Sequence, residues 1–148
     1  MKRIQRIVVA TDFSEIADQA LDHAIDLAEQ LGASVTLVHA YELPMYGFPD
    51  GALITSADMA GRIMAIAQEG LTASVERFRA RGVPLRPVLR TGVPWEEINA
   101  VAADESADLI VVGTHGRRGL SRALLGSVAE RLIRTATRPV LVVRGNTT

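Results

Sequence analysis

Short runs of β-branched and aliphatic residues recur along the chain, and each is apolar at every position instead of at alternate positions. Four such runs cover residues 7–9, 35–38, 109–112 and 140–143. Continuous short apolar runs are typical of strands that are buried on both faces of a parallel sheet. A fifth run, residues 83–91, contains Pro84 and Pro87, which cannot donate ladder hydrogen bonds and therefore favour a sheet edge. The pattern predicts five strands.

Between these runs the apolar residues recur every three or four positions, which is the spacing of one helix face. Ser14 is the predicted N-cap of the first helix and Gly32 its C-terminal stop, while Pro94 suits the first turn of the third helix. The predicted inward positions of the four helices are, in chain order, Ala17, Ala20, Leu21, Ala24, Leu27, Ala28, Leu31; Ala60, Met64, Ala67, Leu71, Val75, Phe78; Trp95, Ile98, Val101; and Leu125, Val128, Leu132, Ala136.

Alternating strands and helices predict an α/β fold in which a five-stranded parallel open sheet is doubly wound by four helices, as in Rossmann-like proteins. Because the third strand is expected at an edge, strands one, two and three should lie side by side in that order. Strands four and five should then lie on the other side of strand one, which gives the order 3-2-1-4-5. The topological switch point then lies between strands one and four, where ligands bind in such sheets. Residues 1–148 are expected to form one domain, since single domains cluster near this length.

The segment after the second strand, residues 41–56, is irregular and contains Pro44, Gly47, Pro49 and Gly51. It should lie on the same rim as the other strand-to-helix loops. Two interpretations stay open: a surface loop whose aromatic side chains pack against the body, or a lid over a ligand.

A glycine-rich segment, residues 113–127, joins the fourth strand to the fourth helix. Glycines let backbone N–H groups approach an anion closely, and a helix N-terminus adds unpaired N–H donors, so phosphate is the expected ligand. The Ser127 hydroxyl could add a hydrogen bond, and Arg117 or Arg118 a charge-assisted one. The alternative is a flexible connection with a solvated basic face.

Asp12 follows the first strand at its carboxyl end, from which a side chain reaches the crevice above the sheet. Two roles compete for it. The carboxylate could accept hydrogen bonds from a sugar or base, or it could cap the first helix beside Ser14. The predicted strand order would place Asp12 opposite the glycine-rich segment.

Composition removes several classes of function. The chain has no cysteine, which excludes disulfides, thiolate metal sites and cysteine nucleophiles, and which fits a cytoplasmic protein. The net charge of −1 predicts neither a nucleic-acid nor a membrane partner, and the apolar runs are too short to span a bilayer. Of the 16 basic residues only Lys2 is a lysine, so a Walker A phosphate clamp has no candidate.

The three histidines, His23, His39 and His115, lack the spacing of a metal site, and core or rim roles are expected for them. A Ser–His–acid triad is not expected either, because its G-x-S-x-G elbow does not occur. No residue presents itself as a general base for water, so efficient hydrolysis is not expected and no catalytic residue is assigned.

The chain resembles the universal stress protein family over essentially its whole length. The resemblance is carried by residues 7–14, 38–40, 92–94, 108–113 and 138–143, and by Gly113, Gly116, Gly126 and Ser127, which fit the signature G-x2-G-x9-G-[ST] of the ATP-binding subgroup. The resemblance implies a cytoplasmic ATP-binding stress protein, with ADP or AMP as alternative ligands, in which nucleotide occupancy acts as a switch. It also implies a homodimer paired through the last strand, residues 140–143, and leaves slow hydrolysis or autophosphorylation with Mg²⁺ or Mn²⁺ open.

By similarity, Asp12 would hold the ribose or a bound metal ion. The other expected nucleotide contacts are Ala10, Thr11 and Ala40 beside the adenine, Val112 and Gly113 along the base and sugar, and Gly116, Arg117, Gly126, Ser127 and Val128 around the phosphates. The alternative function, which needs no nucleotide, is a dimeric interaction module in which the glycine-rich segment is structural.

Overall fold

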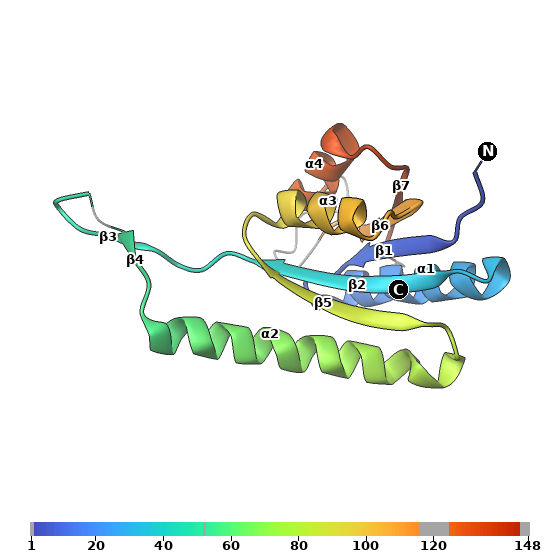
Figure 1. Ribbon diagram of the computed structural model, residues 1–148, viewed down its shortest axis with the longest axis horizontal. Helices are drawn as coiled ribbons and strands as arrows, with labels where there is room; N and C mark the ends of the chain where they lie inside the picture. The colour runs from blue at the N-terminus through green and yellow to red at the C-terminus, as the bar shows by residue number, and fades with distance from the viewer. Residues whose placement is uncertain (1, 52, 116–124, 146–148) are drawn as a thin grey trace.

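A twisted parallel sheet forms the centre of the molecule (Figure 1). The computed structural model describes residues 2–51, 53–115 and 125–145, and the structural statements below refer to these residues. The strands there are β1 (Arg6–Ala10), β2 (Ser34–Tyr41), β3 (Tyr46–Gly47), β4 (Leu53–Ile54), β5 (Leu85–Thr91), β6 (Leu109–Gly113) and β7 (Val140–Val143). The helices are α1 (Glu15–Leu31), α2 (Ala57–Phe78), α3 (Pro94–Asp104) and α4 (Ser127–Thr135), with a 3-10 turn η1 (Arg79–Arg81) after α2.

The order of the strands in the sheet is β5-β2-β1-β6-β7, and every pairing within it is parallel. β1 lies at the centre, where Val8 is in register with Thr36 of β2 and with Ile110 of β6. The predicted order 3-2-1-4-5 is therefore confirmed, and the proline-containing strand β5 lies at an edge. As a consequence, the carboxyl ends of β1 and β6 are neighbours at the switch point.

Two helical layers cover the sheet, α1 and α2 on one face and α3 and α4 on the other (Figure 1). Successive residues of β1 divide between the two cores: Ile7 and Val9 pack in the cluster with α1 and α2, while Val8 and Ala10 pack in the cluster with α3 and α4. Both sets are buried. This double burial explains why the central strands are apolar at every position.

The predicted ends of α1 are confirmed. The Ser14 hydroxyl accepts a hydrogen bond from the Ala17 amide at 3.2 Å, and Gly32 ends the helix in the left-handed conformation with φ 65°. The prediction that Met64 faces inward is wrong, because this side chain is 46% exposed where α2 begins beyond the end of the sheet (Figure 1). Leu125 and Ala136 lie outside α4, whose short apolar face is completed by Ala129 and Leu132.

The irregular segment after β2 contains a small antiparallel hairpin, β3 and β4, in which Tyr46 pairs with Ile54. It projects away from the body of the protein (Figure 1). Met45, Tyr46 and Phe48 are each about half exposed, so the expectation that the aromatic side chains of this loop pack against the body is wrong for Tyr46 and Phe48. A short hairpin has too little apolar surface of its own to bury these rings.

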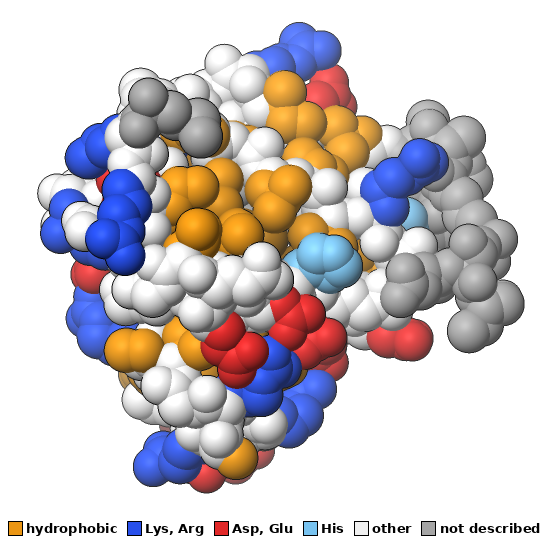
Figure 2. All heavy atoms as spheres, turned by 90° about the vertical axis from the view of Figure 1, so that its right-hand side faces the viewer, with side chains coloured by type: hydrophobic (Ala, Val, Ile, Leu, Met, Phe, Trp, Pro, Cys, Tyr) orange, Lys and Arg blue, Asp and Glu red, His pale blue; other side chains and the backbone are white. Residues whose placement is uncertain are grey.

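Ion pairs join α1 to the end of α2. Arg77 binds Asp18 at 2.8 Å, and Arg81 lies 2.5 Å from Asp26 and 2.8 Å from Glu29. Figure 2 shows basic side chains lying among acidic ones on one face of the molecule. Each exposed ion pair of this kind contributes little to stability, so α2 is held against α1 mainly by apolar contacts.

A second polar clamp fixes the amino ends of β1 and β6. Asp108 accepts hydrogen bonds from the backbone amides of Gln5 at 2.9 Å and Arg6 at 3.0 Å, and Lys2 lies 3.2 Å from its other oxygen. These donors, the Gln5 amide first, hold the pKa of Asp108 below its ordinary value.

No helix in the described part of the chain is both long and apolar enough to cross a membrane.

The lowered pKa of Asp108 predicts a pH-dependent contribution to stability. A carboxyl whose pKa is lower when folded stabilises the protein above its unfolded pKa, about 4, and loses that contribution as pH falls through the folded value. We expect Asp108→Asn to lower the free energy of unfolding at pH 7, with a smaller difference from wild type at pH 3. Urea denaturation at both pH values measures this, and an equal difference at the two would contradict the assignment.

Candidate functional site

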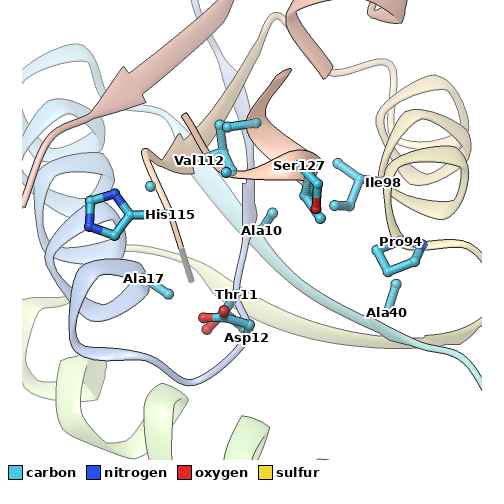
Figure 3. Close-up of a pocket in the computed structure, with 14 residues that line it drawn as sticks. Ala10, Thr11, Asp12, Ala17, Ala40, Pro94, Ile98, Val112, His115 and Ser127 are labelled. Atoms are coloured by element: carbon cyan, nitrogen blue, oxygen red, sulfur yellow. The ribbon is translucent and has the colours of Figure 1, made fainter. Parts of the chain in front are cut away.

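A pocket of about 280 Å³ opens at the carboxyl ends of the central strands (Figure 3). Its described lining consists of Ala10, Thr11, Asp12, Ala17, Ala40, Pro94, Ile98, Val112, Gly113, His115, Gly126, Ser127, Val128 and Ala129. The volume is close to the lower end of the range for small-molecule sites, which are largely apolar with a few placed polar groups. Figure 3 shows Asp12 and Thr11 on one side and Ser127 across from them.

The turn after β1 places the polar side chains Thr11 and Asp12 at the pocket. The Thr11 amide donates to the Val38 carbonyl at 2.9 Å, which carries the β1–β2 pairing one residue past the strand. One Asp12 oxygen accepts from the Ser14 amide at 3.0 Å. The N-cap of α1 is Ser14, so Asp12 does not cap the helix itself but fixes the turn that leads into it, and the same carboxylate also borders the pocket. The two roles are compatible.

Glycines occur where backbones approach too closely for a side chain. A Cβ on Gly113, at the end of β6, would lie 2.6 Å from Cγ2 of Ile16 in α1. A Cβ on Gly126, the residue before α4, would lie 2.9 Å from the His115 Cα and 3.0 Å from the Thr114 carbonyl oxygen. A side chain at position 113 would therefore collide with a side chain of α1, and one at position 126 with the backbone that follows β6.

The N-terminus of α4 points its first turn at the pocket, because Gly126, Ser127, Val128 and Ala129 all line it. Helix geometry leaves the first N–H groups without partners inside the helix, and their dipoles favour an anion. With the Ser127 hydroxyl beside them, this end of the pocket can bind a phosphate group.

Most of the residues predicted for the nucleotide site come together in this one pocket. They are Ala10, Thr11, Asp12, Ala40, Val112, Gly113, Gly126, Ser127 and Val128. Gly116 and Arg117 lie outside the described residues, and so does Arg118. Of residues 41–56, none that the structure describes lines the pocket, so the lid interpretation gains no support from this geometry.

The sequence prediction missed several residues that line the pocket: Ala17, Pro94, Ile98, His115 and Ala129. Pro94 could have been found, since it begins a helix directly after a strand on the same rim. Ile98 and Ala129 are buried helix positions, and spacing alone does not show that they also reach the pocket. They complete an apolar wall that also includes Ala10 and Val112.

The histidines serve different roles. His39, at the end of β2, lies 2.7 Å through its Nδ1 from the Thr11 carbonyl. His23 is exposed on α1. His115 borders the pocket, and its Nδ1 is buried with no hydrogen-bond partner among the described residues. The described part of the chain holds no group of three or more His, Asp or Glu side chains that could bind a metal ion by themselves.

The fold and the pocket define an α/β protein with a pocket at the switch point of a doubly wound sheet, the place where ligands bind in such folds. Comparison with known proteins makes this specific: the model of the universal stress protein family matches residues 3–144. The chain belongs to that family.

Individual relatives agree over most of their length. Universal stress protein MJ0531 of Methanocaldococcus jannaschii is 37% identical over 142 residues, which is 95% of this chain and 82% of that protein. A universal stress protein solved in complex with cAMP is 27% identical with a TM-score of 0.72, and the match covers 98% of this chain and 100% of that one. The Archaeoglobus fulgidus universal stress protein solved in complex with dAMP is 28% identical with a TM-score of 0.68, covering 95% and 98%.

Proposed function

We propose that the pocket binds an adenine nucleotide, ATP or its products ADP and AMP. The observation that carries the proposal is the position of Asp12, Gly113, Gly126 and Ser127 around one pocket at the switch point. The family supports the choice of ligand, because two solved members hold cAMP and dAMP. The pocket chemistry agrees with it, since an apolar wall suits a base and the α4 N-terminus suits phosphate.

Each part of the nucleotide has a candidate partner. The apolar residues Ala10, Ala40 and Val112 would flank the adenine, and Asp12 would accept hydrogen bonds from the ribose hydroxyls. The phosphates would meet the Ser127 hydroxyl and the Val128 N–H, with Gly116 and Arg117 expected to add to this set. Gly113 and Gly126 would let the phosphates approach the backbone closely, although the Gly126 N–H itself donates to the Thr114 carbonyl. These assignments use backbone donors and a hydroxyl in place of the lysine that a Walker A site requires.

A metal ion fits this site only together with phosphate. Mg²⁺ is commonly held by one or two carboxylates, water and substrate phosphates, and Asp12 is the carboxylate that borders the pocket. Mg²⁺ or Mn²⁺ would therefore add charge compensation to the phosphates when nucleotide is bound. We propose that occupancy acts as a switch that biases conformation or dimer association in a cytoplasmic stress protein, with at most slow hydrolysis or autophosphorylation.

Isothermal titration of nucleotide-free protein with ATP, ADP and AMP tests the proposal. We expect micromolar binding of at least one of them, and Ser127→Ala should weaken it by about tenfold to a hundredfold, because a hydrogen bond to a charged group contributes about 1.5–3 kcal/mol. Ser34→Ala is the matched control: this hydroxyl bonds Gln5 at the opposite end of the sheet and should leave affinity unchanged. If none of the three nucleotides binds below millimolar concentration, the proposal is wrong.

The homodimer implied by the family resemblance has a candidate surface at β7. This strand lies at the sheet edge, Leu141 is 38% exposed, and Ile133 on the neighbouring helix α4 is 52% exposed. Proteins usually pair or cover such an edge. We expect sedimentation analysis to find a dimer that Leu141→Glu shifts toward monomer, and a wild-type monomer at all concentrations would exclude this interface.

The exposed hairpin residues Met45, Tyr46 and Phe48 favour a second candidate function, a nucleotide-independent interaction module. Capture of a cellular partner separates the two proposals. A switch predicts that capture changes with ATP and with Asp12→Ala, whereas the interaction module predicts that capture is indifferent to both.

A further inference from the structure

Phe13 has an unusual backbone conformation for its residue type. Its φ is 66°, in the left-handed region that residues with a bulky side chain rarely adopt. It stands between Asp12, which borders the pocket, and Ser14, which caps α1. Its amide donates to the Thr11 hydroxyl at 3.0 Å. A left-handed aromatic residue persists only where its surroundings hold it in place.

Two partners contact the Phe13 ring, one on α2 and one on β2. On α2 the ring covers Gly70, where a Cβ would lie 2.7, 2.8 and 2.9 Å from three ring atoms. Glycine is unfavourable inside a helix, and this contact explains its presence in the middle of α2. On β2 the ring lies against the His39 imidazole, with centroids 4.3 Å apart.

His39 connects the ring to the backbone of the site. Its Nδ1 lies 2.7 Å from the Thr11 carbonyl oxygen, and since a carbonyl can only accept, Nδ1 carries the proton and donates it. The residue before Asp12 is thus fixed from β2, and the residue after it is fixed from α2.

We infer that the Phe13 ring is a wedge between Gly70 of α2 and His39 of β2 that positions Asp12 for the bound nucleotide. Phe13 is a positioning residue, since neither it nor Gly70 lines the pocket. The inference rests on the proposed nucleotide site for its ligand. It has a further consequence: a displacement of α2 as small as one methyl group should change affinity in the pocket.

The test compares two glycines of the same helix. Gly70→Ala should displace the ring and weaken ATP binding about tenfold, since overpacking forces side chains off their rotamers and shifts the backbone. Gly61→Ala is the control, because nothing lies within 4 Å of a Cβ at that position, and it should leave affinity within about twofold of wild type. Phe13→Gly gives an independent variant: glycine accepts the left-handed φ but has no ring, and affinity should again fall about tenfold.

A positional role is distinguished from a general structural defect by combining Gly70→Ala with Asp12→Ala. If the wedge acts through Asp12, Gly70→Ala should cause little further loss once the carboxylate has been removed. Hydrogen exchange gives a readout that needs no ligand: the Ser14 amide, which donates to Asp12, should lose protection in Gly70→Ala and keep it in Gly61→Ala.

Three outcomes would each overturn the inference. One is a double variant whose loss of ATP affinity equals the sum of the two single losses. The others are equal exchange of the Ser14 amide in Gly70→Ala and Gly61→Ala, and wild-type ATP affinity in Phe13→Gly. If wild-type protein binds no adenine nucleotide, the proposed function fails by itself. The exchange of the Ser14 amide still decides whether the wedge positions Asp12.

Discussion

Gly126→Ala should weaken ATP binding by about tenfold or more, because overpacking against a rigid backbone shifts the neighbouring backbone. The added Cβ would lie 2.9 Å from the His115 Cα and 3.0 Å from the Thr114 carbonyl oxygen. Neither atom belongs to a flexible side chain, so the start of α4 must move away from the end of β6. That movement displaces Ser127 and the helix N-terminus, which form the proposed phosphate end of the pocket. Isothermal titration measures the affinity, and thermal unfolding shows whether the variant folds.

Gly126→Ser shows whether the loss of affinity comes from the close contact with residues 114 and 115 or from a change in helix capping. Serine is among the best N-cap residues and glycine is a weaker one, so helix capping alone predicts a gain in stability for this variant. The contact with Thr114 and His115 predicts a loss of both stability and affinity. Gly61→Ala, on the exposed side of α2, controls for the general effect of replacing a glycine in this protein. Tighter binding by Gly126→Ser would show that the close approach is not what requires glycine here.

The arrangement of the sheet could be predicted because its causes are local. Residues 7–9 and 109–112 are apolar at every position, which indicates central strands, and Pro84 and Pro87 assign residues 83–91 to an edge. Those facts leave few strand orders for right-handed crossovers. The order in turn places Asp12 beside Gly113, so the core of the candidate site followed from topology before any contact was known.

Other features could not be predicted because they depend on packing between distant segments. Nothing near Gly70 in the sequence indicates that the Phe13 ring covers it, and the periodicity that places Met64 inward does not reveal where the sheet ends. The apolar wall that Ile98 and Ala129 complete depends on where α3 and α4 lie over the sheet, which their own sequences do not give. Periodicity describes which face of a helix is apolar, whereas the pocket depends on where each helix begins relative to its strand.

The position of α4 depends on the packing of the buried Leu132 side chain more than on the intrinsic stability of this short helix. Helices as short as this one, nine residues, are marginal alone and need tertiary packing. Leu132 is fully buried in the cluster that includes Val8 and Ile110, and Ala129, one turn earlier, is buried in the same cluster and lines the pocket. The fold therefore couples the stability of the core to the geometry of the phosphate end.

Leu132→Ala should lower the free energy of unfolding by about 2–5 kcal/mol, the range for truncating a buried leucine. Because α4 then packs loosely, ATP affinity should fall as well, although Leu132 does not line the pocket. Ile66→Ala is the matched control: this aliphatic side chain lies on α2, away from the pocket and from the candidate dimer surface, and is 66% exposed, so its truncation should change stability by about 0.5 kcal/mol or less. Urea denaturation and isothermal titration measure the two effects. Equal destabilisation by both variants would mean that α4 is not held through its buried face, and full affinity in a destabilised Leu132→Ala would show that the helix N-terminus is positioned by other contacts.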